Sequence, residues 1–424
     1  MRAQHPPQGE PALADHVADP TCPPAAGALA PALPVTLPDN PRVVLFALAM
    51  GGFAIGTTEF AAMALVPYFS AGLGIGEATA SHVISAYALG VVVGAPLIAV
   101  FGARMARRTL LIGLMLAFGL FNLLAAMAPS YRTMLAARFL AGLPHGAYFG
   151  VAALLAASIV PPRQRAQAVA RIMVGLTVAT VLGVPFASVL GQTVGWRWGF
   201  ALVGLLAAVT AALIAAFAPR LAGDPGARPM RELSALGNRQ VWLMLAVGAV
   251  GFGGFFAIYT YTASTLLEVT GAAPGMVPVV LAVFGVGMTL GTLLAGWAAD
   301  RAPARTGFCI LLSGAALAAI YPAATGSLVT ILPVLFLIGM TGSLGTVIQT
   351  RLMDVAGEAQ TLAAALNHSA FNVANALGPW LAAQVLLAGY GLPATGHVGV
   401  ALSLAGAALL AAAVLDARHG KGRA

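Results

Sequence analysis

Long runs of hydrophobic positions alternate along the chain with short polar segments, and each run has the length of a helix that crosses a bilayer. A helix needs ~20 apolar residues for one crossing. Twelve runs meet this length and predict an all-α integral membrane fold. The predicted spans are 43-67, 80-101, 109-128, 133-158, 168-191, 198-218, 241-266, 275-298, 306-326, 329-350, 361-388 and 396-416.

Composition agrees with a membrane protein, because 60% of the 424 residues are hydrophobic and only 8% are charged. The net charge of +8 does not indicate a nucleic-acid partner, since the basic residues are scattered between the spans. With both termini in the cytoplasm, 18 of the 21 Lys and Arg residues fall on the inner side. The positive-inside rule therefore predicts this orientation, in the inner (cytoplasmic) membrane.

The longest polar connection between spans, 220-240, separates six spans from six. Residues 1-41 contain ten prolines and no apolar run, which predicts a disordered cytoplasmic tail. The expected organisation adds an N-terminal six-helix bundle at 42-219, a cytoplasmic linker at 220-240, a C-terminal six-helix bundle at 241-416 and a short cytoplasmic tail at 417-424.

The two halves repeat each other at a nearly constant spacing. Gly90-VVV-Gly94 lies 197 positions before Gly287-MTL-Gly291, and the same offset carries RFLAG from residue 138 onto LFLIG from residue 335. LTVATVLG from residue 176 meets FNVANALG from residue 371 at an offset of 195. Three collinear matches predict an ancestral duplication, which places a transport site at the interface of the halves, near the midplane.

Glu59 is the only carboxylate deep inside a long apolar run. Because a charge at membrane depth costs at least ~2.5 kcal/mol, such a residue usually marks an ion or proton path. The alternative is a neutral Glu hydrogen-bonded to a neighbouring helix. Arg138 lies at comparable depth, either as a direct or water-bridged partner of Glu59 or as an anchor to backbone carbonyls. A nearby guanidinium favours the ionised form of Glu59, whereas a dry environment favours the protonated form. Alternation between these two forms is what a proton carrier requires.

His145 shares a helical stripe with Arg138, either as a proton relay or as a packing residue. Other polar residues on the later spans are candidates for a substrate cavity of mixed polarity. Tyr near a span's end also serves in interfacial belts, and Asn at helical spacing also serves in hydrogen bonds between helices. The cavity candidates are Tyr259, Thr262, Thr346, Gln349, Asn372 and Asn375.

Several motifs resemble those of the major facilitator superfamily, in the drug and sugar:proton antiporter branch that includes the arabinose efflux permease. Motif A resembles the loop from residue 99 to 111, although Ala103 and Ala106 replace the expected Asp and Gly. Its copy from residue 296 to 305 keeps the Asp. The resemblance therefore implies a cytoplasmic gate in which the charge-assisted contacts of this loop to neighbouring helix ends are intact in the second half only. The gate residues are Arg104, Arg107, Arg108, Asp300, Arg301 and Arg305.

Motif B resembles the segment from Arg138 to Gly146, and motif C, associated with antiporters, resembles Gly175, Gly183 and Pro185. The resemblance implies the major facilitator fold, with two pseudo-symmetric six-helix bundles. It also implies that the first, fourth, seventh and tenth spans line a central cavity.

These observations predict proton-coupled secondary efflux of a small organic solute, of the drug, sugar or nucleoside class, by alternating access. The alternative is a proton- or sodium-coupled importer of the same fold. ATP is not the direct fuel, because the only lysine, Lys421, belongs to no phosphate loop. An enzyme would need a catalytic cluster, which the spans lack, and a sensor would need a signalling domain. We expect a monomer in the lipid bilayer, with protons and a small-molecule substrate as partners and with no cofactor or metal.

Overall fold

The computed structural model describes residues 40–102, 104–161, 164–221, 237–299, 301–355 and 360–421. Within these ranges the chain is helical and forms no strand, which confirms the predicted all-α fold class. Most of the predicted tail at 1-41, most of the linker at 220-240, and Asp300 lie outside the described residues.

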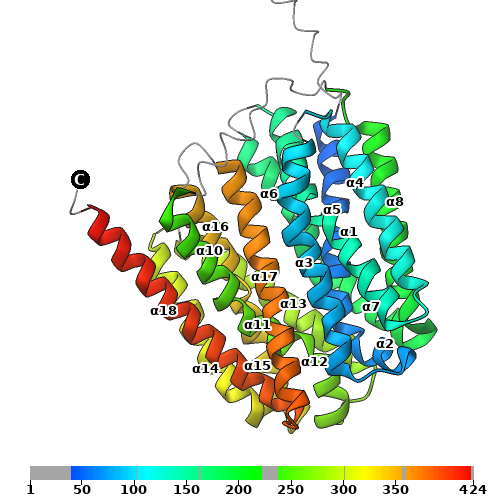
Figure 1. Ribbon diagram of the computed structural model, residues 1–424, viewed down its shortest axis with the longest axis vertical. Coiled ribbons are helices and arrows are strands. Elements are labelled where there is room, and N and C mark those ends of the chain that lie inside the picture. The colour runs from blue at the N-terminus through cyan, green and yellow to red at the C-terminus, as the bar shows by residue number, and fades with distance from the viewer. Residues whose placement is uncertain are drawn as a thin grey trace, which may run out of the picture. The chain divides into compact units, whose positions relative to one another are not determined.

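The helices of the first half gather on one side of the ribbon in Figure 1. The first begins where the Asn40 side chain accepts a hydrogen bond from the Arg42 N–H and Pro41 pre-sets the helical φ angle. The elements are α1 (Pro41–Ala64), α2 (Val66–Leu73), α3 (Glu77–Gly102), α4 (Arg107–Ala126), α5 (Tyr131–Ser158), α6 (Arg165–Val178), the π-helix η2 (Ala179–Gly183), α7 (Val184–Leu190), the π-helix η3 (Gly191–Gly195) and α8 (Trp196–Phe217).

The helices of the second half occupy the other side of the same view. Its last helix runs to Lys421, beyond the predicted end of the span at residue 416. The elements are α10 (Arg239–Gly251), α11 (Gly253–Thr260), α12 (Thr262–Ser264), the π-helix η5 (Thr265–Val269), α13 (Met276–Ala299), α14 (Pro303–Ala324), α15 (Leu328–Thr341), α16 (Leu344–Val355), α17 (Gln360–Leu387), the 3-10 helix η6 (Leu392–Ala394) and α18 (Thr395–Lys421).

Eleven helical segments of the described chain are long and apolar enough to cross a membrane. The fifth, Gln167–Phe217, has 51 residues and contains two of the predicted spans. A helix of that length would extend over ~75 Å, far more than one hydrocarbon core. The chain reverses inside it at Gly195, whose φ of 120° suits glycine and begins α8. The eleven segments therefore correspond to twelve crossings.

The duplication predicted from the sequence reappears as repeated contacts. The Cα of Gly90 on α3 faces the backbone carbonyl of Phe139 on α5, so closely that a side chain would collide with it. Gly287 on α13 faces the carbonyl of Phe336 on α15 in the same way, and both members of the pair are shifted by 197. Small residues let helix backbones approach each other in this manner.

The caps of the two related helices repeat as well. Ser130 accepts a hydrogen bond from the Thr133 N–H at 3.4 Å at the start of α5. Ser327 accepts one from the Thr330 N–H at 3.3 Å at the start of α15, again 197 positions later. The fold thus preserves the repeat in its helix starts as well as in its helix packing.

The halves differ in the continuity of their equivalent helices. α1 and α5 run without a break, whereas α10 gives way to α11 at Phe252, and α15 gives way to α16 at Gly342 and Ser343. α15 and α16 together cover 328–355, which is α5 shifted by 197. An interruption of the backbone hydrogen-bond ladder is where a helix bends most readily.

The halves meet along two pairs of elements, with α3 packed on α17 and α13 packed on η2 and α7. Near α2 and α12, α1 also contacts α11 and α12. Every residue from Ala54 to Ala64 and from Gly253 to Thr260 is buried. Helices buried on all faces occupy the centre of a helical protein, so α1 and α11 form its centre at this level.

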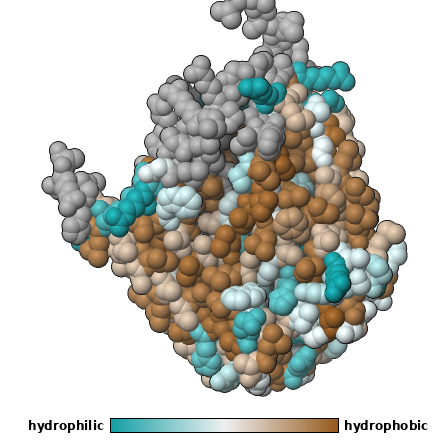
Figure 2. Space-filling model, in the orientation of Figure 1, coloured by the Kyte–Doolittle hydropathy of each residue, from teal (hydrophilic) through white to brown (hydrophobic). Residues whose placement is uncertain are grey.

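The outer surface of the structure is apolar. Figure 2 shows hydrophobic residues across the middle of the visible face and hydrophilic residues mainly toward its ends. Large apolar side chains such as Leu293, Trp297 and Val329 are exposed by 66%, 62% and 84%. A soluble domain rarely exposes so much contiguous apolar surface, whereas a lipid-facing one does.

Candidate functional site

Glu59 lies in the buried part of α1 and is only 2% exposed. Its Oε1 accepts a hydrogen bond of 3.4 Å from Nδ2 of Asn375 on α17. The two residues are 316 positions apart and belong to different halves. The carboxyl group predicted to carry protons therefore contacts the interface between the halves, through one of the residues predicted to line the cavity.

Arg138 is fully buried on α5 and is held by side chains of its own half. Its Nη1 donates to Oγ1 of Thr58 at 3.0 Å and to Oδ1 of Asn122 at 3.4 Å. The Thr58 hydroxyl itself donates to Asn122 Oδ1 at 2.8 Å. The guanidinium carbon lies 4.1 Å from the centre of the Tyr87 ring and 5.3 Å from that of Phe200. Such cation–π contacts partly compensate a desolvated guanidinium.

Arg138 and Glu59 do not form a direct ion pair within 4.0 Å in the described part of the chain. Thr58 and Glu59 are consecutive, and successive helical residues point about 100° apart. Thr58 turns toward Arg138 in the first half, whereas Glu59 turns toward α17. The helices that carry the two residues, α1 and α5, are in contact, and opposite charges at buried positions attract each other through space. A water-bridged relation between the two stays a prediction.

Sequence reasoning did not select Thr58, Tyr87 or Asn122 for this cluster. Asn122 carried a usable signal, because it is the one uncharged amide within the apolar α4. The same criterion, a lone polar group in an apolar run, had selected Glu59. Tyr87 had no comparable signal, since tyrosines are common in membrane spans as interfacial or packing residues.

His145 joins the cluster through Tyr87, whose hydroxyl lies 2.9 Å from His145 Nδ1. The His145 ring contacts Phe149, which is stacked on His368 of α17 with ring centres 5.0 Å apart. A continuous series of contacts thus connects Arg138 to the second half. The geometry accommodates both interpretations of His145, proton relay and packing.

The remaining cavity candidates separate into two groups. Tyr259 is buried and packs its ring against Phe60, Phe255 and Phe284. Asn372 is buried one turn before Asn375 and donates from Nδ2 to the His368 carbonyl at 3.0 Å.

The hydroxyl of Thr262, at the start of α12, donates to the carbonyl of Ile258 near the end of α11. Thr346 and Gln349 are partly exposed on α16, and among the described residues neither side chain hydrogen-bonds to Glu59 or Asn375. The structure therefore brings Asn372, Asn375 and Tyr259 to the region around Glu59, and it places Thr346 and Gln349 on α16, which packs on α17.

The gate residues differ from the expectation. In the first half, Arg107 donates from Nη1 to the carbonyl of Leu154 at 3.1 Å, and Arg108 donates from Nη2 to the carbonyl of Ala215. Both carbonyls lie toward the C-terminal end of a neighbouring helix, where cations are stabilised by the helix dipole. Arg104 is exposed in the turn that precedes these residues.

In the second half, Arg301 donates to the carbonyl of Trp297 at 2.7 Å and lies over that residue's own ring. Arg305 is exposed near the start of α14. The expectation that only the second half would keep contacts to neighbouring helix ends is therefore wrong for the described residues, because a guanidinium alone suffices for the carbonyl contacts of the first half. Asp300 lies outside the described residues.

The motif C residues shape the contact of α1 with α6 and η2. A side chain at Gly175 would collide with the carbonyl of Ala49, and one at Gly183 with the hydroxyl of Thr57. Pro185 follows the π-helix η2 and lies in the first turn of α7. Proline lacks an N–H group, so a wider helical turn before it leaves fewer backbone groups unsatisfied.

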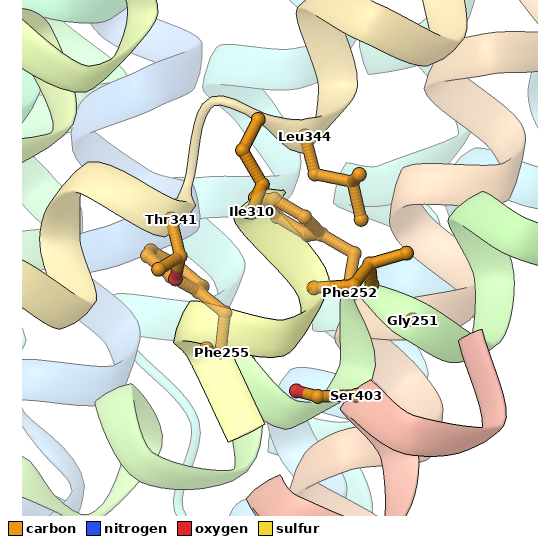
Figure 3. A pocket seen from close by; sticks show the side chains of 9 residues that line it. Gly251, Phe252, Phe255, Ile310, Thr341, Leu344 and Ser403 are labelled. Carbon is orange, nitrogen blue, oxygen red and sulfur yellow. The ribbon is translucent and has the colours of Figure 1, made fainter. Parts of the chain in front are cut away.

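A small cavity lies within the second half, beside the breaks in its helices. It has a volume of ≈ 10 Å³, about the space of one water molecule. Figure 3 shows Phe252, Phe255, Thr341, Leu344 and Ser403 among the side chains that line it. The cavity adjoins the break at Phe252 and the break between Thr341 and Leu344.

Two duplicated helical halves with a buried carboxyl group bonded across their interface define a membrane transporter. The family model described as the Major Facilitator Superfamily matches residues 48–273 and 243–424. The chain therefore belongs to the Major Facilitator Superfamily, as its motifs predicted.

Similar proteins support this assignment. The chain is 40% identical over 367 residues to the inner membrane transport protein YdhP of Escherichia coli (strain K12), which covers 85% of this chain and 94% of that protein. It is 34% identical over 350 residues to a chloramphenicol resistance protein of Streptomyces lividans, with coverage of 81% and 88%. The crystal structure of a mutant of the nucleoside transporter NupG superimposes with a TM-score of 0.72 at 10% identity, covering 88% of this chain and 100% of that one, and shows the same fold.

Proposed function

We propose that this transporter exports a small organic solute in exchange for protons and that Glu59 carries the proton. The observation that supports this most directly is the hydrogen bond between Glu59 and Asn375, which connects a buried carboxyl group to the opposite half. The coupling group then lies where the halves separate and rejoin during alternating access.

The Asn375 amide suits either protonation state of Glu59. An amide N–H donates equally well to a carboxylate oxygen and to the carbonyl oxygen of a protonated carboxyl group. When the halves rock apart at this level the bond breaks, and Glu59 is left with the field of Arg138 in its own half. Rocking thereby changes the surroundings of the proton site, which is the requirement for coupling.

Export is favoured over import by motif C and by the relative named for chloramphenicol resistance. Within this proposal the bundles at 42–219 and 241–416 are the rocking bodies, and the protein is a monomer in a bacterial inner membrane with both termini in the cytoplasm. His145 and Arg138 tune the proton site, and Tyr259, Asn372 and Asn375 face the solute. Thr262, Thr346 and Gln349 stay secondary candidates.

Transport into inverted membrane vesicles with an imposed pH gradient tests the proposal. The panel contains an aromatic drug, a hexose and a nucleoside, each radiolabelled. Glu59→Gln keeps the shape of the side chain and its ability to accept from Asn375, but it cannot exchange a proton. Wild-type uptake of at least one solute should rise with the gradient, and Glu59→Gln should lose that response.

Glu268→Gln is the matched control, because Glu268 is an exposed acid on η5 near the end of its span. It should transport like the wild type. Gradient-independent uptake of every solute by the wild type would reject proton coupling. Full coupling in Glu59→Gln would instead assign the proton to another group and leave the fold and the transporter class intact.

A further inference from the structure

The polar atoms that α17 leaves without a partner near Glu59 are hydrogen-bond acceptors. Asn372 and Asn375 are both 0% exposed, and Oδ1 of each has no hydrogen-bond partner among the described residues. The amide orientations are fixed by chemistry, since Nδ2 of Asn372 donates to a backbone carbonyl and Nδ2 of Asn375 donates to a carboxyl oxygen. The two Asn side chains of α17 and the Glu59 carboxyl group of α1 together offer three acceptor groups at the interface.

Aromatic rings surround the same acceptor groups. Phe60 follows Glu59 on α1 and packs on Phe256 and Tyr259 of the opposite half, with ring centres 6.3 and 5.6 Å apart. Phe371 precedes Asn372 and contacts Phe252 and Phe256 at 4.8 and 5.0 Å. These rings pack on one another in the present state, so a solute would replace ring–ring contacts with equivalent contacts of its own.

Resting on the proposed function, we infer that the interface at Glu59, Asn372 and Asn375 binds a solute that carries hydrogen-bond donors on an aromatic framework. The donors, from an amine, a hydroxyl or an amide, fill the acceptors that the protein leaves open. The aromatic part stacks with Phe60, Phe256 and Phe371. A buried acceptor without a donor is costly, so a solute that supplies the donor gains affinity at this place.

A sugar fits this surface less well. Each hydroxyl of a hexose both donates and accepts, so a sugar site needs donors as well as acceptors. On α17, Asn372 and Asn375 each use one of their two amide N–H groups within the protein, which leaves a single donor on each beside an unfilled acceptor. Arg138 has unfilled N–H groups at Nε and Nη2, but its guanidinium is enclosed in the first half by Thr58 and the rings of Tyr87 and Phe200.

Binding can be measured without transport, on the purified full-length protein in nanodiscs, by saturation-transfer NMR with empty nanodiscs subtracted. The probes are 2-(1-naphthyl)ethylamine, 2-(1-naphthyl)ethanol, the methyl ether of that alcohol, and glucose. The amine and the alcohol have a donor on the same ring system, and the ether has none. We expect saturable binding of the amine, the alcohol or both, with the ether weaker by on the order of 10-fold and with no binding of glucose.

Two variants locate the site. Asn372→Leu and Asn375→Leu remove one acceptor each, and either should weaken the donor probes by on the order of 10-fold while leaving the ether unchanged. Phe118→Leu is the control, because it removes a buried ring of the first half that lies away from this interface. Thermal unfolding of every variant separates loss of binding from loss of fold, and Asn372→Ser replaces Asn372→Leu if the latter unfolds.

Equal binding of the alcohol and its ether, or binding of glucose in preference to the naphthyl probes, would overturn the inference. The outcome is independent of proton coupling. Proton-driven uptake of a sugar with no binding of the naphthyl probes would reject this solute class and keep the proposed function. Binding of the probes with no response to a pH gradient would reject proton coupling and keep the binding site.

Discussion

The two halves of this transporter share a packing scheme but differ in what they place at equivalent positions. Thr58, Tyr87 and Arg138 in the first half correspond, at the offset of 197, to Phe255, Phe284 and Leu335 in the second. The first set forms a hydrogen-bonded and cation–π cluster, whereas Phe255 and Phe284 pack edge to face at 5.2 Å. Glu59 itself corresponds to Phe256. Equivalent positions thus carry polar and ionisable side chains in the first half and aromatic or aliphatic side chains in the second.

The difference extends to the backbone. The charged cluster is carried by helices that run unbroken, α1 and α5, while their equivalents in the second half are interrupted beside a small cavity. A buried charge tolerates little displacement of its partners, because each lost hydrogen bond leaves it uncompensated. Aromatic packing is less directional. From this comparison we expect the second half to bend more readily than the first, which under the proposed function would keep the proton site in fixed geometry.

Arg138→Leu gives the first half the residue of the second, and it should have the largest effect on transport. We expect proton-driven uptake to fall by on the order of 100-fold, because the charge that acts on Glu59 is lost. The stability should fall by roughly 1 to 3 kcal/mol, since the buried oxygens of Thr58 and Asn122 lose the donor that Arg138 supplies. Uptake assays and thermal unfolding measure the two quantities on the same preparation.

The reverse exchange, Leu335→Arg, is the control for Arg138→Leu. Leu335 is fully buried, and the residues at the equivalent of the Arg138 cluster are apolar. An arginine there has no prepared acceptors, so the variant should lose roughly 3 kcal/mol of stability. If Leu335→Arg folded as well as the wild type, the second half would be able to hold a charge, and the contrast between the halves would not stand.

Gly90→Val and Gly287→Val test whether the repeated contact costs the same in both halves. Each valine would meet a backbone carbonyl of the neighbouring helix. Overpacking of this kind costs roughly 1 to 3 kcal/mol. We expect Gly90→Val to be the more destabilising, because α15 can yield at its break after Thr341 while α5 has none. Thermal unfolding gives the ranking, and a larger loss for Gly287→Val would contradict a compliant second half.

Much of this fold follows from the sequence, because a span in lipid must satisfy its backbone as a helix and must be long and apolar. The twelve spans and the repeat are visible in hydrophobic runs and spaced glycines, and the family was indicated by the resemblance of several motifs. Glu59 and Asn375, both chosen from the sequence, are hydrogen-bonded across the interface of the halves, and their roles in proton coupling and solute binding stay predictions. The spans and the repeat depend on composition and period, which the sequence states directly.

The partners of each side chain do not follow from the sequence. Arg138 turns to Thr58 and Asn122 instead of pairing directly with Glu59, and this choice depends on the rotation of α1 against α4 and α5. The gate was misjudged for a similar reason, since Arg107 and Arg108 use backbone carbonyls that any sequence supplies. The helix breaks at Phe252 and Gly342 have no proline but lie among glycines or at a Gly–Ser pair. Other spans contain glycines as well, so these residues alone do not single out the two breaks.

Gly314→Ala should make the second half of the protein more rigid. Gly314 lines the cavity in the second half, and an added methyl would lie 3.5 Å from the Ser403 hydroxyl, an ordinary contact. Its equivalent in the first half is already Ala117. Removing a helical glycine should raise stability by about 1 kcal/mol. We expect the transport rate to fall about threefold, since stability gained in a moving part commonly costs activity.

Ala117→Gly is the counterpart of Gly314→Ala in the first half. It should lower stability by about 1 kcal/mol and leave the transport rate unchanged, because α4 does not adjoin a helix break. Rates from initial uptake and unfolding temperatures from the same membranes decide the comparison. A rate change in Ala117→Gly equal to that in Gly314→Ala would show that bending is shared by both halves.

The smallest effects should come from the paired caps, Ser130→Ala and Ser327→Ala. Each serine accepts one N–H at nearly the same distance, so each substitution should cost about 1 kcal/mol. Equal costs, measured by thermal unfolding, would mean that the break after Thr341 acts locally and leaves the start of α15 as firmly held as that of α5. A smaller loss of stability in Ser327→Ala would mean that the start of α15 is less firmly held than the start of α5. The flexibility of the second half would then include the start of α15 as well as the region around the cavity.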